Sequence, residues 1–339
     1  MALPAVSREV RVARLPDGLP EPEHFAVVEV PVPPPGDGEV LVRNRFFQVF
    51  PSLRTLIGGG VAGTPFPALR AGDALFGAAV GEVVSAAPGT GLAAGALVRH
   101  WAGWREYAVV PAGQCVPLGD ALPDPVAYLG QGATAYTALT RDAPVRPGDT
   151  VFVSGGAGGV GVLAGQVARL LGAGRVIGST GSAEKAARMV GEFGYDTALV
   201  RGDAPIADQL AKAAPDGIDV FVDNVGGEQL QAAIGAARTE GRFVIVGALS
   251  GQLAPDLAGT TAPVEIDTFQ LIARRITMRG FGGADESGGP AEWAERFGGW
   301  LRSGAITFPH VRVAGIENAP RALHELITGR HLGTVVVEP

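Results

Sequence analysis

The stretch Val151-Phe152-Val153-Ser154-Gly155-Gly156-Ala157-Gly158-Gly159-Val160-Gly161 decides the fold expected for this chain. A short β-branched and aromatic run ends in a cluster of glycines, and an apolar pattern with helical spacing follows. Gly156, Gly158 and Gly161 fill a G-x-G-x-x-G pattern between a predicted strand and a predicted helix. That context predicts a dinucleotide-binding turn with the pyrophosphate at a helix N-terminus. With 51 glycines in 339 residues, a glycine-rich turn in some other α/β protein is the competing interpretation.

Each of the three glycines has a separate expected role. Gly156 permits the tight turn, Gly158 lets the backbone approach a pyrophosphate, and Gly161 lets the helix pack close to the strand. Gly159 and Val160 lie in the same turn and are expected to contact the cofactor as well.

Composition and charge exclude several classes of protein. A chain of 339 residues, 47% hydrophobic and 18% charged, is expected to be globular and to form two domains. A net charge of −7 without a lysine-rich block gives little support for nucleic-acid binding. We expect no secretory leader, and no apolar run reaches the roughly 18 residues that span a membrane. Because Cys115 is the single cysteine, no internal disulfide can form, which fits a reducing cytoplasm.

The spacing of apolar residues predicts two kinds of structure along the chain. The first 122 residues favour β-structure, with strands expected at 10–13, 25–32, 39–47, 78–85, 96–100 and 104–109. After a helical stretch at 125–138, strands are expected at 150–154, 175–179, 197–200, 219–223, 241–247 and 275–281. Helices are expected between them at 159–172, 182–193, 205–213, 227–237 and 267–273. This alternation predicts an α/β, doubly wound parallel sheet.

The remaining segments complete the expected organisation. A long connection at 248–266 is expected near the active site, because it follows a strand at its C-terminal end. A helix at 290–303 carries an apolar face that favours core packing. A helix at 319–328 and a strand at 334–337 are expected to pack back on the first domain. The expected domains are therefore 1–122 with 306–339, and 123–305.

Several segments together resemble the medium-chain dehydrogenase/reductase superfamily. They are similar above all to its zinc-independent alkenal and prostaglandin reductase branch, which is related to the quinone oxidoreductases. The segments are 78–84, 103–109, 133–136, 147–150, 182–185, 223–227 and 279–281. Asp223-Asn224-Val225-Gly226-Gly227 is the most specific of them. The resemblance implies a β-rich, GroES-like catalytic domain, a Rossmann domain and an active site in the cleft between them. It also implies a homodimer that pairs the last Rossmann strand, at about 276–281.

The residues that follow the glycine turn favour NADPH over NADH. An acidic residue about 20 positions further on would bind the ribose 2′-OH of NAD, but the second strand ends without a carboxylate. Ser179, Thr180 and Lys185 instead offer hydroxyls and a cation for a 2′-phosphate, and the resemblance gives Lys185 the same role. Where the branch carries Asn-Tyr-Lys, this chain has Val200-Arg201-Gly202, so Arg201 is expected to contact adenine or the phosphate. Asn224 and Gly247 complete the expected cofactor-binding set.

No metal is expected in the reaction. One cysteine supplies neither the catalytic nor the structural zinc ligands of the zinc-dependent relatives, and no Gly-His-Glu segment is present. Without zinc, polarising a carbonyl or alcohol for an ordinary dehydrogenase reaction is difficult. Reduction of a conjugated C=C bond requires less stabilisation from the protein. Hydride adds to the β-carbon, and hydrogen-bond donors stabilise the enolate oxygen.

The catalytic candidates depart from the branch. Gln252 stands where members often carry a tyrosine, and Ser52 stands where the Asp-Pro-Tyr-Met-Arg segment has another. Both can donate hydrogen bonds, but neither is a useful proton donor near pH 7. We therefore expect protonation by solvent, or a substrate unlike a simple alkenal. Tyr136 is a substitute donor, with a packed tyrosine as the competing interpretation.

The leading hypothesis is a cytoplasmic, NADPH-dependent reductase of an activated C=C bond in a small hydrophobic carbonyl substrate. The alternatives are a quinone oxidoreductase and a specialised biosynthetic enzyme for a polyketide-like or terpenoid-like substrate, including one with a non-redox reaction. A non-catalytic NADPH-binding protein is the alternative from another class.

Overall fold

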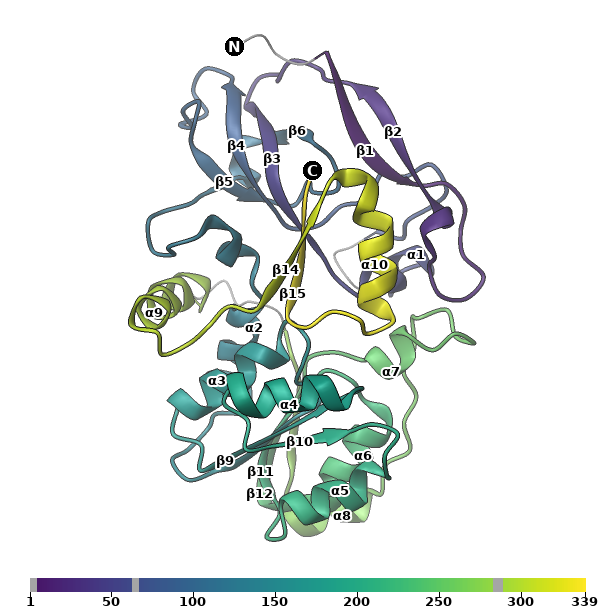
Figure 1. The fold of residues 1–339 in the computed structure, drawn as a ribbon, viewed down its shortest axis with the longest axis vertical. Coiled ribbons are helices and arrows are strands. Elements are labelled where there is room, and N and C mark those ends of the chain that lie inside the picture. Colours follow the sequence, from purple (N-terminus) through teal and green to yellow (C-terminus); the bar gives the residue numbers. More distant parts are fainter. Residues whose placement is uncertain (1–4, 63–66, 283–288) are drawn as a thin grey trace. The chain divides into compact units, whose positions relative to one another are not determined.

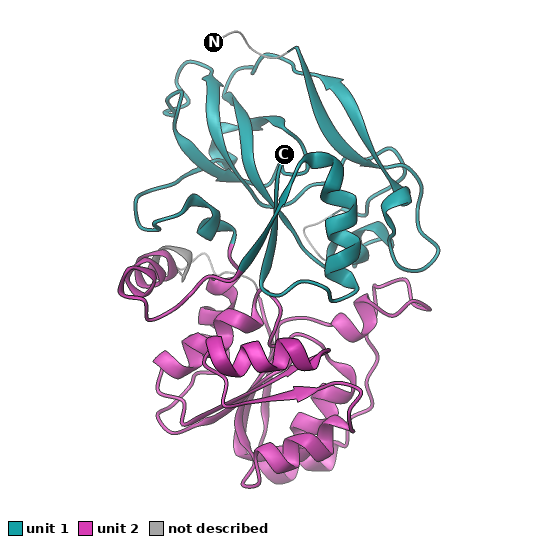
Figure 2. Ribbon diagram, viewed as in Figure 1, with its two compact units in different colours: residues 1–129, 310–339 teal, residues 130–309 magenta. Residues whose placement is uncertain are grey.

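The structure is a computed structural model that describes residues 5–62, 67–282 and 289–339 (Figure 1). The chain divides into two compact units (Figure 2). Unit 1 comprises Met1–Leu129 and His310–Pro339, and unit 2 comprises Gly130–Pro309. The sequence-based expectation placed these divisions after residues 122 and 305.

Unit 2 contains a six-stranded parallel sheet in the order β10-β9-β8-β11-β12-β13. The first three strands in the chain are β8 (Thr150–Val153), β9 (Arg175–Thr180) and β10 (Thr197–Val200). The next three are β11 (Ile218–Asp223), β12 (Ala237–Ile245) and β13 (Thr277–Gly280). Numbered from β8, the order is 3-2-1-4-5-6, which is the doubly wound order of dinucleotide-binding domains. The expected fold class is confirmed.

Helices connect these strands as the sequence pattern predicts. They are α3 (Gly161–Leu170), α4 (Ala183–Glu192), α5 (Ile206–Ala213), α6 (Gly227–Ala236) and α8 (Thr268–Arg274). The long connection before α8 carries one short helix, α7 (Leu249–Gln252). All four residues of β8 are buried, as expected for a central strand covered on both faces. In the core, the ring of Phe221 stacks on Phe152 at 5.0 Å and meets Phe243 edge-on at 5.3 Å.

The prediction of one continuous helix at 125–138 is wrong. A 3₁₀ turn, η3 (Pro125–Leu129), precedes α2 (Gly132–Thr137), and the π-helical turn η4 (Ala138–Asp142) follows. Two glycines, Gly130 and Gly132, interrupt the pattern. A Cβ on Gly132 would lie 1.9 Å from the indole of Trp293 in α9 (Gly289–Ser303), so this break lets the two helices pack closely.

Unit 1 contains a seven-stranded sheet in the order β14-β15-β3-β4-β5-β7, with β6 pairing β3. Its N-terminal strands are β3 (Glu39–Val49), β4 (Ala79–Ala86), β5 (Leu97–His100), β6 (Tyr107–Pro111) and β7 (Val116–Pro117). The C-terminal strands β14 (His310–Ala314) and β15 (Thr334–Glu338) join it, with η5 (Ile316–Asn318) and α10 (Ala319–Ile327) between them. The C-terminal tail therefore belongs to unit 1.

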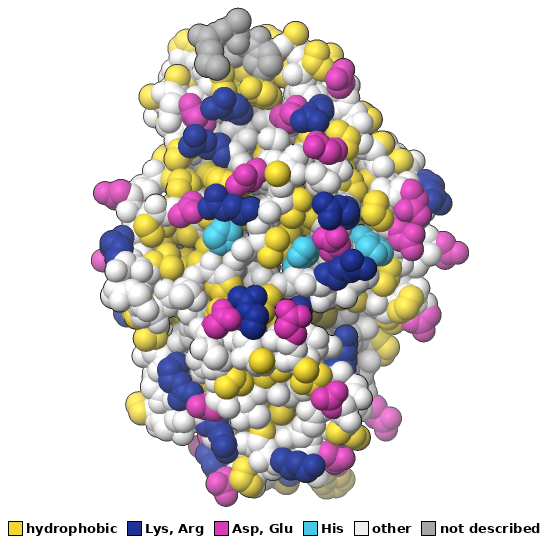
Figure 3. All heavy atoms as spheres, in the orientation of Figure 1, with side chains coloured by type: hydrophobic (Ala, Val, Ile, Leu, Met, Phe, Trp, Pro, Cys, Tyr) yellow, Lys and Arg dark blue, Asp and Glu magenta, His cyan; other side chains and the backbone are white. Residues whose placement is uncertain are grey.

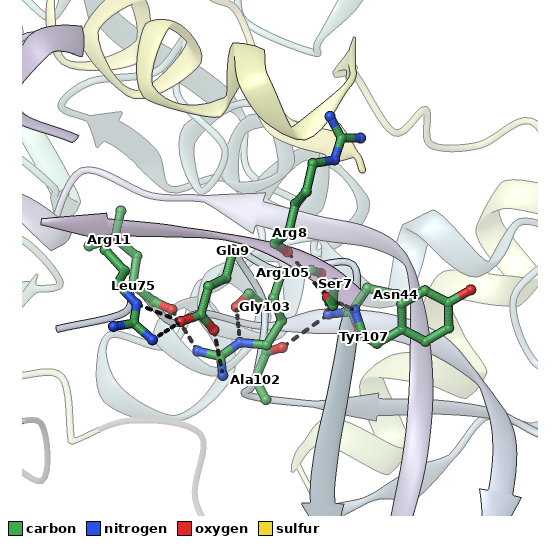
Figure 4. Close-up of polar contacts among 10 residues, drawn as sticks. All are labelled: Ser7, Arg8, Glu9, Arg11, Asn44, Leu75, Ala102, Gly103, Arg105 and Tyr107. Atoms are coloured by element: carbon green, nitrogen blue, oxygen red, sulfur yellow. Dashed lines mark hydrogen bonds and ion pairs between the residues drawn. The ribbon is translucent and has the colours of Figure 1, made fainter. Parts of the chain in front are cut away.

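A separate two-stranded sheet, β1 (Val6–Val12) with β2 (Phe25–Pro31), follows the N-terminus, and the 3₁₀ turn η1 (Pro22–His24) precedes β2. Polar contacts lie along β1 and join it to Arg105 and to the start of β6 (Figure 4). Glu9, 5% exposed, pairs with Arg11 at 2.7 Å and with Arg105 at 3.5 Å. The hydroxyl of Ser7 accepts a hydrogen bond from the backbone N–H of Tyr107.

Several short elements of unit 1 differ from expectation. The sequence pattern did not predict the short helix α1 (Leu53–Ile57), the 3₁₀ turn η2 (Ala112–Gln114) or the strand β14. The strand expected at 104–109 begins at Tyr107 instead, because Trp104 is buried in the left-handed region with φ of 61°. On the face drawn in Figure 3, basic and acidic side chains are interspersed, without a basic patch of the kind that binds nucleic acid.

Candidate active site

The glycine turn after β8 has the predicted strand–turn–helix context, but its sharp bend is one residue earlier than expected. Gly155 has φ of +62°, a conformation that glycine adopts without strain. At Gly156 an added Cβ would lie 2.4 Å from Met189 Cε, the end of a flexible side chain, and 3.0 Å from the Tyr195 hydroxyl, so a larger residue would displace these two side chains. The backbone N–H of Gly156 donates to Ser179 O at 2.7 Å, which ties the turn to the end of β9.

The second and third glycines of the pattern differ in the space around them. A Cβ on Gly161 would lie 2.4 Å from Gly155 O, so α3 can begin this close to the strand only with glycine at this position. Gly158 is exposed, and its nearest neighbour would be 3.4 Å from an added Cβ. Gly159 and Val160 are half-buried and lead into α3. The turn thus leaves the backbone at Gly158 accessible to a phosphate group beside a helix N-terminus.

A basic and hydroxyl-bearing region lies at the ends of β9 and β10. Ser179 is buried, and its hydroxyl accepts a hydrogen bond from Gly155 N at 3.1 Å. Thr180, the last residue of β9, is 8% exposed. Lys185 lies in the first turn of α4, half-buried, and desolvation lowers its pKa. A Cβ on Gly181 would be 3.4 Å from Nη2 of Arg201, so this guanidinium lies beside the loop that follows β9.

The ends of β11 and β12 hold the other two predicted cofactor residues. The backbone N–H of Asn224 donates to Ser154 Oγ at 2.8 Å, and its side-chain Nδ2 donates to Ser154 O at 2.7 Å. A Cβ on Gly247 would lie 2.8 Å from Asn224 O, so these two loops require a glycine where they approach. Sequence reasoning did not select Ser154 and Asp223 as candidate site residues, although both lie within motifs that it quoted.

The catalytic candidates occupy three different places. Gln252 ends α7, is half-buried and lies at the same carboxyl edge of the sheet, since Leu249 N in that helix donates to Asn224 O. Ser52 is exposed and precedes α1 in unit 1. The structure therefore places Gln252 on the same edge of the sheet as Asn224, one of the residues predicted to bind the cofactor.

Tyr136 packs against α9. Its hydroxyl donates to Glu292 Oε1 at 2.7 Å, and its ring lies 5.8 Å from that of Trp293. Burial and the hydrogen bond with Glu292 raise the pKa of Tyr136. These contacts favour a packing role over that of a proton donor.

Among the residues that the structure describes, no three His, Cys, Asp or Glu side chains are grouped to hold a metal ion. In the same residues, no helix is long and apolar enough to cross a membrane.

These features define a class of protein. Unit 2 has a parallel sheet in doubly wound order and a glycine turn at a helix N-terminus. The second strand of this sheet ends in a cationic region without a carboxylate. This combination is typical of a site for an NADP-type dinucleotide. Unit 2 is thus the cofactor-binding domain of an oxidoreductase.

Comparisons with known proteins identify the family to which this oxidoreductase belongs. Residues 8–118 match the family model described as the N-terminal domain of oxidoreductase, and residues 159–299 match that described as zinc-binding dehydrogenase. The NADPH-dependent curcumin reductase of Escherichia coli is 31% identical over 333 residues, covering 96% of this chain and 95% of that protein. Prostaglandin reductase 1 of Bos taurus is 31% identical and covers 95% of each. The crystal structure of CurA from Vibrio vulnificus in complex with NADPH has a TM-score of 0.87 at 31% identity, covering 98% of both chains.

The chain belongs to the zinc-independent alkenal and prostaglandin reductase branch of the medium-chain dehydrogenase/reductase superfamily. The expectations of this branch, of an oxidoreductase and of NADPH as its cofactor are confirmed.

Proposed function

We propose that this enzyme uses NADPH to reduce the C=C bond of a small, hydrophobic α,β-unsaturated carbonyl compound. The observation that carries the proposal is the similarity over the whole chain to a curcumin reductase and a prostaglandin reductase. The 2-alkenal reductase of Nicotiana tabacum, 29% identical and covering 99% of this chain, agrees with it. The glycine turn and the cationic region beside β9 fit the cofactor.

Residues of unit 2 would hold NADPH along the carboxyl edge of the sheet. The turn from Gly156 to Gly161 would bind the diphosphate, because the backbone at Gly158 is exposed and α3 presents its N-terminus there. Ser179, Thr180, Lys185 and Arg201 would surround the 2′-phosphate. Asn224 and Gly247, at the ends of β11 and β12, would contact the nicotinamide half.

When bound, NADPH would supply a hydride for the β-carbon of the substrate, and negative charge would develop on the carbonyl oxygen. The Gln252 amide would donate a hydrogen bond to that oxygen, and the Ser52 hydroxyl is the second candidate donor. Because neither group releases a proton near neutral pH, water would protonate the α-carbon. A cytoplasmic location fits the single, buried Cys115.

Oxidation of NADPH with a panel of enones and quinones tests this function. We expect turnover of enones, and Gln252→Ala should lower kcat about tenfold with the Kd for NADPH unchanged, because one enolate-stabilising donor is lost. Gln231→Ala, an exposed glutamine on α6, is the matched control. Turnover of quinones alone would contradict the proposed reaction, and an unchanged kcat in Gln252→Ala would remove its role.

We also propose that two copies of the chain pair through β13. This strand is at the edge of the described six-stranded sheet, where its outer hydrogen-bonding groups are available to another strand. On α8 next to it, Phe269 and Ile272 are 78% and 71% exposed, which is unusual for large apolar side chains.

The double variant Phe269→Asp/Ile272→Asp should convert the dimer into a monomer, because charges would replace apolar contacts at the interface. Sedimentation velocity measures the change. Val190→Asp, which alters an exposed apolar residue on α4, is the control and should remain dimeric. A monomeric wild-type protein, or a double variant that stays dimeric, would contradict this interface.

A further inference from the structure

Ser154 and Asp223 form a buried hydrogen bond at the carboxyl ends of β8 and β11. The Ser154 hydroxyl donates to Asp223 Oδ1 at 2.7 Å, and both residues are 0% exposed. The same hydroxyl accepts the backbone N–H of Asn224 at 2.8 Å. We call the Ser154–Asp223 pair the strand-end latch. It joins the residue that begins the glycine turn to the residue that precedes Asn224.

The latch also fixes the turn that leads into α6. Asp223 Oδ1 accepts the backbone N–H groups of Val225 and Gly226, each at 2.9 Å. Gly226 has φ of 76°, so the chain bends there through a conformation that depends on glycine. One carboxyl oxygen therefore holds three donors from two neighbouring loops, and both loops face the expected path of the cofactor.

The second oxygen of Asp223 has a different environment. Oδ2 is buried and has no hydrogen-bond partner among the residues that the structure describes. Burial raises the pKa of Asp223, although the accepted hydrogen bonds oppose that shift. A full charge on this side chain would also oppose a diphosphate bound at the adjoining turn. The hydrogen bonds that the Asp223 side chain accepts are thus all made by Oδ1.

We propose that Ser154 and Asp223 are positioning residues for NADPH, which hold the glycine turn and Asn224 in register through Asp223 Oδ1 and without requiring a carboxylate charge. This inference rests on the proposed function only for the identity of the cofactor.

Asp219 offers a matched comparison on the same strand. Its Oδ2 accepts the backbone N–H of Thr150 at 2.8 Å, so it joins β11 to β8 at their opposite, amino ends. It also pairs with Arg238 at 2.8 Å. A side chain that merely links the strands should affect folding stability at either end. If Ser154 and Asp223 position the cofactor, only substitutions at the carboxyl end should raise the Kd for NADPH.

The test compares Ser154→Ala, Asp223→Ala, Asp223→Asn and Asp219→Ala in the full-length enzyme. The Kd for NADPH is measured by fluorescence without a second substrate, and the free energy of unfolding by denaturant titration. Ser154→Ala and Asp223→Ala should raise the Kd about tenfold, and Asp223→Asn, which keeps the acceptor oxygen, should recover most of that loss. Asp219→Ala should lower stability and leave the Kd within about twofold.

Three results would overturn the proposal. The first is an unchanged Kd in Ser154→Ala, the milder variant, which keeps the test decisive if Asp223→Ala does not fold. The second is an Asp223→Asn variant as weak as Asp223→Ala, which would show that the charge is required. The third is an equal rise in Kd for Asp219→Ala. The Kd measurement uses NADPH without an enone. A protein that binds NADPH but does not reduce enones would therefore contradict the proposed function and leave this test unaffected.

Discussion

Lys185→Ala is expected to raise the KM for NADPH about 10- to 100-fold while changing the KM for NADH less than about twofold, because a charge-assisted hydrogen bond to the 2′-phosphate is lost. Lys185 is half-buried in the first turn of α4, which follows shortly after Ser179 and Thr180 at the end of β9. Partial desolvation strengthens its attraction to a phosphate dianion. NADH lacks that phosphate, so its binding does not use this side chain.

Initial-rate measurements with both cofactors check the prediction. Lys212, on α5, is the only other lysine of the chain and is exposed, so Lys212→Ala is the natural control. Arg201→Ala should also raise the KM for NADPH, but by less than Lys185→Ala does, because Arg201 is exposed. An equal loss for NADPH and NADH in Lys185→Ala would refute the assignment of the 2′-phosphate site.

The second large effect is expected from Gly161→Ala. The new Cβ would lie 2.4 Å from Gly155 O and 2.5 Å from Gly156 Cα, and these are backbone atoms that cannot rotate away. The turn must therefore shift, which should destabilise the fold by about 1–3 kcal/mol and weaken NADPH binding more than tenfold. Thermal unfolding of the apo enzyme and NADPH titration measure the two effects.

Gly158→Ala separates binding from stability at the same turn. An added Cβ would be 3.4 Å from its nearest neighbour, so apo stability should change by less than about 0.5 kcal/mol. The methyl group would nevertheless occupy the exposed side that a diphosphate must approach, and the Kd should rise. Gly191→Ala, on α4 with nothing within 4 Å of the added Cβ, is the control. If Gly158→Ala bound NADPH like the wild type, the diphosphate would lie elsewhere.

Much of unit 2 could be predicted from sequence because its signals are local. The β-branched runs, the glycine pattern and the helical spacing between them each lie within a few neighbouring residues, and the sheet order follows from their alternation. The role of Gly161 was predictable for the same reason. The sharp bend was assigned to Gly156 although it lies at Gly155, since adjacent glycines are equivalent in a pattern.

The latch and the position of Tyr136 could not be predicted, because both depend on residues far apart in the chain. Ser154 and Asp223 are separated by 69 positions, and Tyr136 and Glu292 by 156. Likewise, nothing local marks Trp104 as a residue with positive φ, since bulky side chains rarely adopt it. Pairings of this kind appear only once the strands are placed.

Deuterium transfer tests the central claim most directly. NADPH carrying deuterium at nicotinamide C4 is incubated with the enzyme and an enone, and the product is examined by NMR and mass spectrometry. We predict a saturated ketone or aldehyde with deuterium on the former β-carbon and the α-hydrogen from solvent. An allylic alcohol with deuterium on the former carbonyl carbon, or oxidation of NADPH without deuterium at the β-carbon, would contradict the proposed reduction of the C=C bond.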